Sequence, residues 1–149
     1  MKKVWKTLSF WCINKIKKYI THNMAQKILI VDDESHIRML IEQTLEELED
    51  EGVEFLTAEN GEEALGIIEE EKPDLVFLDV MMPKMNGMEV CRRIKKELQL
   101  TDVFIILLTA KGQELDRQRG QEVGADIYMT KPFDPEAILD KAKKVLKIA

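Results

Sequence analysis

Runs of consecutive apolar residues recur at regular intervals along the chain. They cover residues 28–31, 75–78 and 103–108, and each is bounded by charged or turn-forming residues. A short apolar run of this kind is typical of a strand buried on both faces of a parallel sheet. Two less uniform segments, 53–58 and 126–130, are also predicted to be strands.

Between these strands the apolar residues change to helical spacing, which predicts five helices. Ser35, Asn60 and Asp134 are the expected caps, and Glu63 makes Asn60 part of a capping box. The segment 113–123 is predicted to be a weakly held helix because it has only two large apolar residues. The residues predicted to form the inner faces of the other four helices are Ile37, Leu40, Ile41, Thr44, Leu45 and Leu48; Ala64, Leu65, Ile67 and Ile68; Met88, Cys91, Ile94 and Leu98; Ile138, Ala142, Val145 and Leu146.

Strands that alternate with helices imply right-handed crossovers and a parallel sheet covered on both faces. The pattern therefore predicts a doubly wound α/β fold with a five-stranded parallel sheet and five helices. At 149 residues, the chain has enough sequence for one such domain, over 24–149, and little for a second.

The net charge of −6 conceals an asymmetry between the two parts of the chain. Residues 1–23 hold six lysines and no acid, so the rest carries 16 basic and 28 acidic residues, a net charge of −12. A domain this acidic is expected to repel nucleic acid. Cys12 and Cys91 form no CxxC pair, which suits a reducing, cytoplasmic environment.

Polar residues stand where four of the predicted strands end. Asp32 and Asp33 follow the first strand, Asp79 the third, Thr109 the fourth and Lys131 the fifth. In open α/β sheets the carboxyl ends of the strands form the ligand site. Three close carboxylates require a cation, and an open site with oxygen ligands suits Mg²⁺. A lysine and a hydroxyl complete a set suited to phosphoryl chemistry, with one Asp as the nucleophile.

Four motifs in this order closely resemble the receiver domain of two-component response regulators, over nearly all of residues 26–149. They are Ile30-Val31-Asp32-Asp33-Glu34, Leu78-Asp79 through Asn86-Gly87, Leu108-Thr109-Ala110 and Lys131-Pro132-Phe133. The resemblance implies the flavodoxin-like receiver fold and a cis Lys-Pro bond. It also implies phosphorelay signalling, in which an aspartate receives a phosphoryl group from a histidine kinase or phosphotransfer protein.

The resemblance also assigns a role to each residue of the predicted site. It implies that Asp79 is the acceptor and that Asp33, Asp79 and the backbone carbonyl of Met81 bind Mg²⁺. Asp32 is implied to help through a water molecule. Lys131 would contact the acyl phosphate, Thr109 would move toward it, and the rotamer of Tyr128 would follow.

Three other functions and a purely structural role are alternatives to a receiver domain. A phosphatase of the haloacid dehalogenase type needs a second Asp two residues after its nucleophile, where this chain has Met81. A nucleotide-binding switch needs GxxxxGK[ST], which is absent from the sequence. A flavodoxin-like cofactor binder has no use for three acids, and a purely structural acidic domain leaves their common position unexplained.

Partners are expected from the receiver resemblance and from the weak helix. Since no output domain follows Ala149 in the sequence, we expect a phosphorylation-dependent docking surface for an effector protein over 113–148. The expected role is a phospho-acceptor switch that assists its own phosphorylation and dephosphorylation, rather than an enzyme.

The basic leader, residues 1–23, is not expected to belong to the domain core. No stretch approaches the ~20 apolar residues of a membrane span, and no small-residue cleavage site marks a signal peptide. One interpretation is a start misassigned ahead of Met24. The other is a basic amphipathic helix with weak contact to an anionic membrane surface.

Overall fold

The computed structural model describes residues 11–16, 19, 25–110 and 114–149. The five strands are β1 (Lys27–Val31), β2 (Glu54–Ala58), β3 (Leu75–Asp79), β4 (Phe104–Ala110) and β5 (Ile127–Lys131). The α-helices of the domain are α2 (Ser35–Thr44), α3 (Gly61–Glu71), α4 (Gly87–Arg92), α5 (Glu114–Glu122) and α6 (Pro135–Leu146). A 3₁₀-helix, η2 (Glu46–Glu51), follows α2, and a π-helix, η3 (Arg93–Glu97), continues α4.

The strands form one parallel sheet in the order β2-β1-β3-β4-β5. β3 lies at the centre, and its residues from Leu75 to Asp79 are all buried. The doubly wound α/β fold is thus confirmed, with the strand bounds predicted to within two residues. The largest difference is in β4, which continues through Thr109 to Ala110 because Thr109 and Ala110 still pair with β5.

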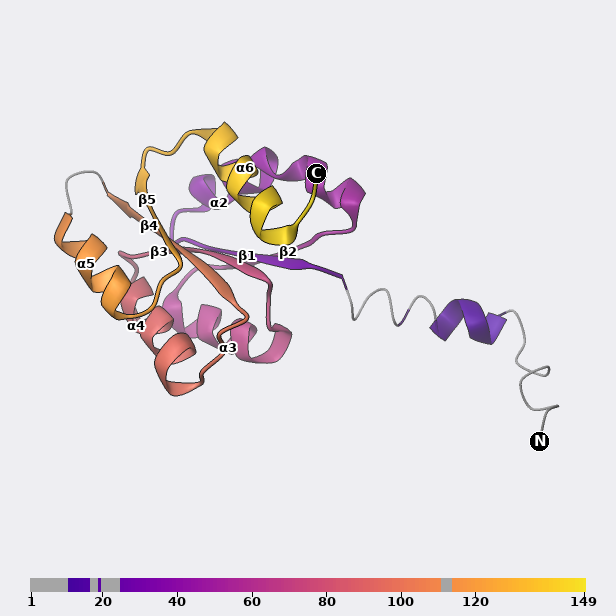
Figure 1. The fold of residues 1–149 in the computed structure, drawn as a ribbon, viewed down its shortest axis with the longest axis horizontal. Coiled ribbons are helices and arrows are strands. Elements are labelled where there is room, and N and C mark those ends of the chain that lie inside the picture. Colours follow the sequence, from indigo (N-terminus) through magenta and orange to yellow (C-terminus); the bar gives the residue numbers. More distant parts are fainter. Residues whose placement is uncertain (1–10, 17–18, 20–24, 111–113) are drawn as a thin grey trace.

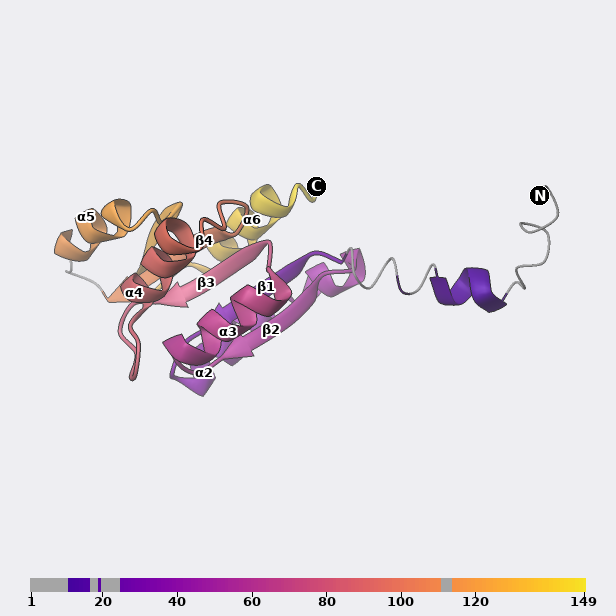
Figure 2. The same ribbon diagram turned by 90° about the horizontal axis from the view of Figure 1, so that it is seen from below.

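Helices cover both faces of the sheet (Figures 1 and 2). On one face the residues Ile28, Ile30, Leu75 and Phe77 pack with α2 and α6, whose buried residues include Ile41 and Ile138. On the other face α3 and α4 cover the alternate positions of the same strands, with Ile68 and Val90 in the core. Strands buried on both faces need apolar side chains at every position, which explains the uninterrupted runs in the sequence.

Two of the three expected helix caps are confirmed. Asn60 Oδ1 accepts from Glu63 N at 2.9 Å, and Asp134 Oδ1 accepts from Glu136 N at 3.0 Å. The reciprocal half of the capping box goes instead to Glu59 N, at 3.4 Å from Glu63 Oε2. The prediction for Ser35 was wrong, because Ser35 is the first residue of α2. The N-cap is Glu34, whose side chain makes no capping hydrogen bond.

The predicted inner faces of two helices differ from those in the structure. The helix after β1 stops at Thr44, and the six residues before Gly52 form η2, so Leu48 reaches the core from a different helix type. Leu40 and Leu98 were predicted to face inward but are each 42% exposed. Leu40 lies within α2 and Leu98 directly follows η3, so each continues the apolar pattern of the sequence without being buried.

In the basic leader, residues 11–16 are helical, and Trp11, Ile13, Ile16 and Tyr19 expose their side chains to solvent. Figure 1 shows this helix clear of the sheet and its covering helices. Within the described part of the chain, no helix has the length and apolar character needed to cross a membrane.

A tight loop joins the central strand to α4. Gly87 N donates to Val80 O at 2.9 Å, and Asn86 Oδ1 accepts from Glu89 N at 2.9 Å to start the helix. A Cβ at Gly87 would lie 2.2 Å from Asp79 O, which is closer than any real contact. The absence of a side chain at Gly87 therefore allows α4 to begin directly against the end of β3.

Replacing Gly87 with Ala should therefore lower the free energy of unfolding by about 2 kcal/mol or more, because a Cβ must displace the backbone of β3. Gly66 is the matched control, since it lies on the exposed face of α3 with nothing within 4 Å of a built Cβ. Gly66→Ala should raise stability by about 0.5–1 kcal/mol. Urea denaturation measures both, and equal changes in the two variants would contradict the close approach at Gly87.

Candidate functional site

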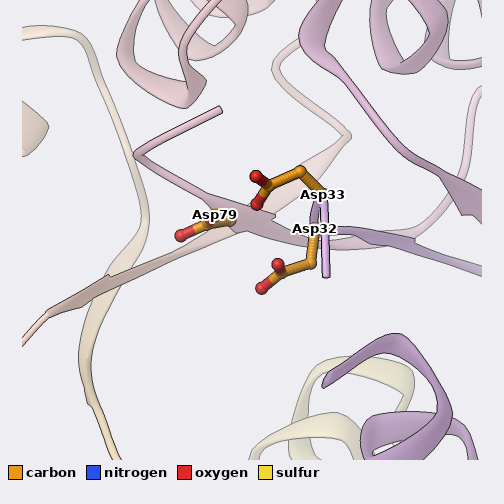
Figure 3. A group of neighbouring side chains, drawn as sticks. All are labelled: Asp32, Asp33 and Asp79. Carbon is orange, nitrogen blue, oxygen red and sulfur yellow. The ribbon is translucent and has the colours of Figure 1, made fainter. Parts of the chain in front are cut away.

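Three carboxylates meet at the carboxyl ends of β1 and β3. Asp32 and Asp33 directly follow β1, and Asp79 is the last residue of β3, the strand next to it. Each of the three acids offers a carboxylate oxygen, and these oxygens all lie within 4.8 Å of one another. Figure 3 shows the three side chains gathered at the strand ends. The parallel sheet thus brings together acids that are 46 positions apart in the sequence.

Asp32 is fully buried, and both of its carboxylate oxygens are engaged. Oδ2 accepts from Lys131 Nζ at 2.6 Å, and Oδ1 accepts from Glu34 N at 2.9 Å. Asp33, in contrast, is exposed. Asp32 is therefore held in place by protein groups, whereas Asp33 presents its carboxylate to solvent.

Asp79 combines burial with a single described cation. It is 5% exposed, and its Oδ1 lies 3.2 Å from Lys131 Nζ. Burial, together with the negative charges of Asp32 and Asp33, raises the pKa of Asp79 from 3.8 to about 6, although Lys131 acts in the opposite direction. Added positive charge beside Asp79 would therefore favour its ionised form.

Lys131 ends β5 and reaches across the end of the sheet to two acids. Burial alone would lower the pKa of its ammonium group, but the hydrogen bond to Asp32 and the charges of Asp79 and Asp32 outweigh burial and raise that pKa. The peptide bond between Lys131 and Pro132 is cis, as the family resemblance implied. The structure thus joins Asp32, Asp33, Asp79 and Lys131 into one pocket.

Thr109 and Tyr128 lie on the neighbouring strands β4 and β5. Thr109 is 2% exposed and lies one residue beyond Leu108, which pairs with Asp79. Side chains alternate along a strand, so Thr109 shares a face with Leu107, and Tyr128 packs into that same core. A cavity of about 260 Å³, lined partly by Gly120 and Gln121, lies beside Tyr128.

Met81 stands two residues after Asp79, and its side chain is 65% exposed. A thioether is a poor ligand for a hard cation, so only the backbone carbonyl of this residue suits that role. The loop that carries Met81 closes between Val80 and Gly87, which keeps it next to the pocket.

Sequence reasoning missed Arg38. Its Nη1 donates to Asp32 O at 2.6 Å, and its Nη2 lies 3.3 Å from Glu59 Oε1, so the guanidinium ties the end of β1 to the loop after β2. The only available signal was its position, four residues after Glu34 on a helix that starts directly after the acids. The contact with a backbone oxygen has no sequence signature.

The chemistry of this donor set suits a hard divalent cation. The exposed Asp33 and the buried Asp79 supply oxygen ligands on one side of the pocket, and Lys131 supplies a fixed positive charge on the other. Asp79 is buried beside Lys131, and a carboxylate that positive charge keeps ionised can attack an electrophile with anionic oxygens.

The family model described as the response regulator receiver domain matches residues 28–143. Among solved structures, the chemotaxis response regulator CheY4 of Vibrio cholerae is 35% identical, with a TM-score of 0.70 over 81% of this chain and 98% of that one. The response regulator DrrB of Thermotoga maritima is 37% identical, with a TM-score of 0.71 over 83% and 53% of the two chains.

Curated relatives match the same part of the chain. The probable transcriptional regulator ycf27 of Porphyra purpurea is 49% identical over 127 residues, which cover 85% of this chain and 50% of the relative. The regulatory protein PhoP of Bacillus subtilis is 46% identical over 124 residues, which cover 83% and 50%. The chain spans about half the length of these relatives.

The burial of Asp79 and its repulsion by Asp32 and Asp33 predict that Asp79→Asn stabilises the metal-free protein. The folded pKa of Asp79 exceeds the unfolded value, so its favourable contribution is present below pH 3.8 and is lost as the pH rises through about 6. The variant should be more stable than the parent by about 1–3 kcal/mol at pH 8, and by less at pH 4.5. Denaturant unfolding in metal-free buffer measures the free energy of unfolding at both pH values.

Asp102→Asn, which removes an exposed acid outside the pocket, is the control. If Asp79→Asn raised the free energy of unfolding equally at both pH values, the repulsion would be contradicted.

Proposed function

The chain belongs to the response regulator receiver domain family, and from this membership we propose that Asp79 is its phosphoryl acceptor. Receiver domains act in phosphorelay signalling through a phosphorylatable aspartate. The observation that supports Asp79 is its place at the end of the central strand, within 3.2 Å of Lys131 and beside two further acids. Asp32 has both oxygens engaged, and Asp33 has no buried cation within the described contacts, so Asp79 fits the role best.

In the proposed reaction the Asp79 carboxylate attacks the phosphorus of a phosphohistidine on a histidine kinase or phosphotransfer protein. A phosphorus–oxygen bond to Asp79 forms, and the phosphorus–nitrogen bond to the histidine breaks, with its electron pair left on the imidazole. Lys131 remains within reach of Asp79 Oδ1 and offsets the charge of the phosphoryl oxygens. Because an ionised nucleophile is required, the cations that favour ionised Asp79 also favour the reaction.

Mg²⁺ is the proposed cofactor, with Asp33, Asp79 and the Met81 carbonyl as ligands. Asp32 is proposed to act through a water molecule, which agrees with the engagement of both its oxygens by Lys131 and Glu34. When bound, the ion supplies positive charge to the ionised acids and to the phosphoryl oxygens.

Thr109 and Tyr128 are proposed to transmit the phosphorylated state. Thr109 follows Leu108, the partner of Asp79 in β3, and a hydroxyl at this position can donate to a phosphoryl oxygen once Asp79 carries one. Tyr128 lies two positions before Thr130, the partner of Thr109 in β5, beside a cavity that Gly120 helps to line. Movement of Thr109 toward Asp79 vacates space that the ring of Tyr128 can then fill.

An effector protein is proposed to read this change on the surface over 113–148, formed by α5, β5 and α6. The acidic composition of 24–149 argues against nucleic acid as its partner, and cytoplasmic phosphodonors argue for a cytoplasmic location. The proposed role is a phospho-acceptor switch that also assists its own dephosphorylation.

Incubation with acetyl phosphate and Mg²⁺ should add one phosphoryl mass to the chain, and hydroxylamine should remove it, since an acyl phosphate is the product. Asp79→Asn should abolish the adduct because an amide is not a nucleophile. Intact-protein mass spectrometry measures the labelling. Asp33→Asn should slow labelling strongly and reduce its dependence on Mg²⁺.

The controls separate the acceptor from general effects on charge and folding. Asp102→Asn removes an exposed acid and should label at the parent rate. If Asp79→Asn labels to the same extent as the parent, the acceptor is a different residue. If Asp33→Asn keeps the full Mg²⁺ dependence, the proposed ligand set is wrong.

Amide hydrogen exchange should locate the readout surface. Exchange in α5 and β5 should be faster than in α3 at rest and should slow when fluoroberyllate mimics the phosphoryl group, because few apolar residues hold α5. α3, with Ala64 and Ile68 buried in the core, serves as the internal control and should not change. Equal protection of residues 114–148 in both states would argue against this surface.

A further inference from the structure

The basic segment, residues 1–23, has no place in the phosphoryl chemistry of the pocket. It contains six lysines without an acid, and it contains Trp5 and Trp11, the only two tryptophans of the chain. The family match begins at residue 28, beyond this segment. Its composition therefore calls for an explanation separate from the receiver domain.

The described residues of the segment expose apolar side chains. Trp11 is 67% exposed, Tyr19 69% and Ile16 48%, although burial would favour all three. Eight large apolar side chains are exposed among the residues that the structure describes, and four of them lie between positions 11 and 19. Exposed apolar side chains concentrated in this way mark an interaction surface.

Positive charge lies directly beside these apolar groups. Lys15 Nζ is 4.7 Å from the centroid of the Trp11 ring, and Lys17 and Lys18 follow in the sequence. A surface that accepts this segment must therefore offer negative charge and apolar depth together. Aromatic rings with polar edges, flanked by lysines, suit the boundary between lipid headgroups and acyl chains.

We propose that residues 1–23 bind the surface of an anionic lipid bilayer and tether the receiver domain to it. The lysines would contact anionic headgroups, and Trp11, Ile16 and Tyr19 would enter the interface. The domain itself supplies abundant acid but few exposed apolar partners, since the large exposed apolar residues among its described side chains are Met39, Leu40, Met81 and Leu98. An anionic bilayer offers both negative charge and apolar depth, whereas the acidic domain offers mainly negative charge.

The point of attachment leaves the phosphoryl site accessible. The segment joins the domain ahead of Lys27, where β1 begins, whereas Asp32 and Asp33 follow the opposite end of the same strand (Figure 1). In a parallel sheet all five strands share this polarity. The tether therefore enters at the edge opposite the acidic pocket, and a phosphodonor can still reach Asp79.

The two tryptophans make the test direct, because fluorescence of the full chain reports on this segment alone. Vesicles of phosphatidylglycerol and phosphatidylcholine should shift the emission to the blue and sediment the protein at low salt. Vesicles of pure phosphatidylcholine should do neither. About 1 M salt should release the protein, because it shortens the Debye length to about 3 Å.

Two sets of variants test charge and apolar insertion separately. Replacing Lys15, Lys17 and Lys18 with Gln should weaken partitioning by about 100-fold, and Lys84, Lys96 and Lys144 to Gln is the matched control on exposed domain positions. Replacing Trp11 and Tyr19 with Ser should also weaken binding at constant charge. Met39→Ser, at an exposed apolar residue of the domain, is the control.

Several outcomes would overturn the tether. Binding that is absent, or that the control lysines reduce as much as the segment lysines, would refute it. A blue shift without lipid that salt abolishes would place the segment on the acidic domain instead. Labelling by acetyl phosphate in the absence of vesicles should be the same for all these variants, so a failure of the tether is distinguishable from a failure of the phosphoryl site.

Discussion

The ion pairs of Lys131 govern this structure, because they keep three carboxylates together at one end of the sheet. Asp32 and Asp79 are buried, and Lys131 lies 2.6 Å from an oxygen of the first and 3.2 Å from one of the second. Close like charges would otherwise drive the pocket apart or protonate it. Burial and the remaining repulsion from Asp32 and Asp33 raise the pKa of Asp79 to about 6, so positive charge placed beside Asp79 would favour its ionised form.

The sheet separates the apolar cores on its two faces from the polar residues at its strand ends. Apolar side chains of β1 and β3 fill two cores on opposite faces, and the acids lie at the carboxyl ends of these strands, with Asp79 as the last residue of β3. Thr109 and Tyr128 follow the face that α3 and α4 cover, while Lys131 reaches the acids at the strand ends. The acids at the strand ends and the pair formed by Thr109 and Tyr128 thus occupy different parts of the same sheet, and the pairing of β4 with β5 connects them.

Most of this arrangement is encoded locally in the sequence. Apolar runs such as 75–78 predict strands because a strand covered on both faces needs an apolar side chain at every position. The strand order then places Asp79 beside Asp32. What the sequence cannot show are contacts that depend on exact distances. Arg38 bonds to a backbone oxygen, Gly87 lacks a side chain because α4 approaches Asp79, and Leu40 and Leu98 are exposed although they continue the apolar pattern.

The bond between Lys131 and Asp32 joins residues 99 positions apart, and β5 lies at the edge of the sheet, last in the order. During synthesis a ribosome releases the acids of β1 and β3 long before the lysine that neutralises them. The emerging chain therefore carries an incomplete and electrostatically unfavourable pocket until β5 adds to the sheet. A chain truncated before β5 would therefore lack the lysine that the structure places beside Asp32 and Asp79, and these two buried acids would lose their described cation.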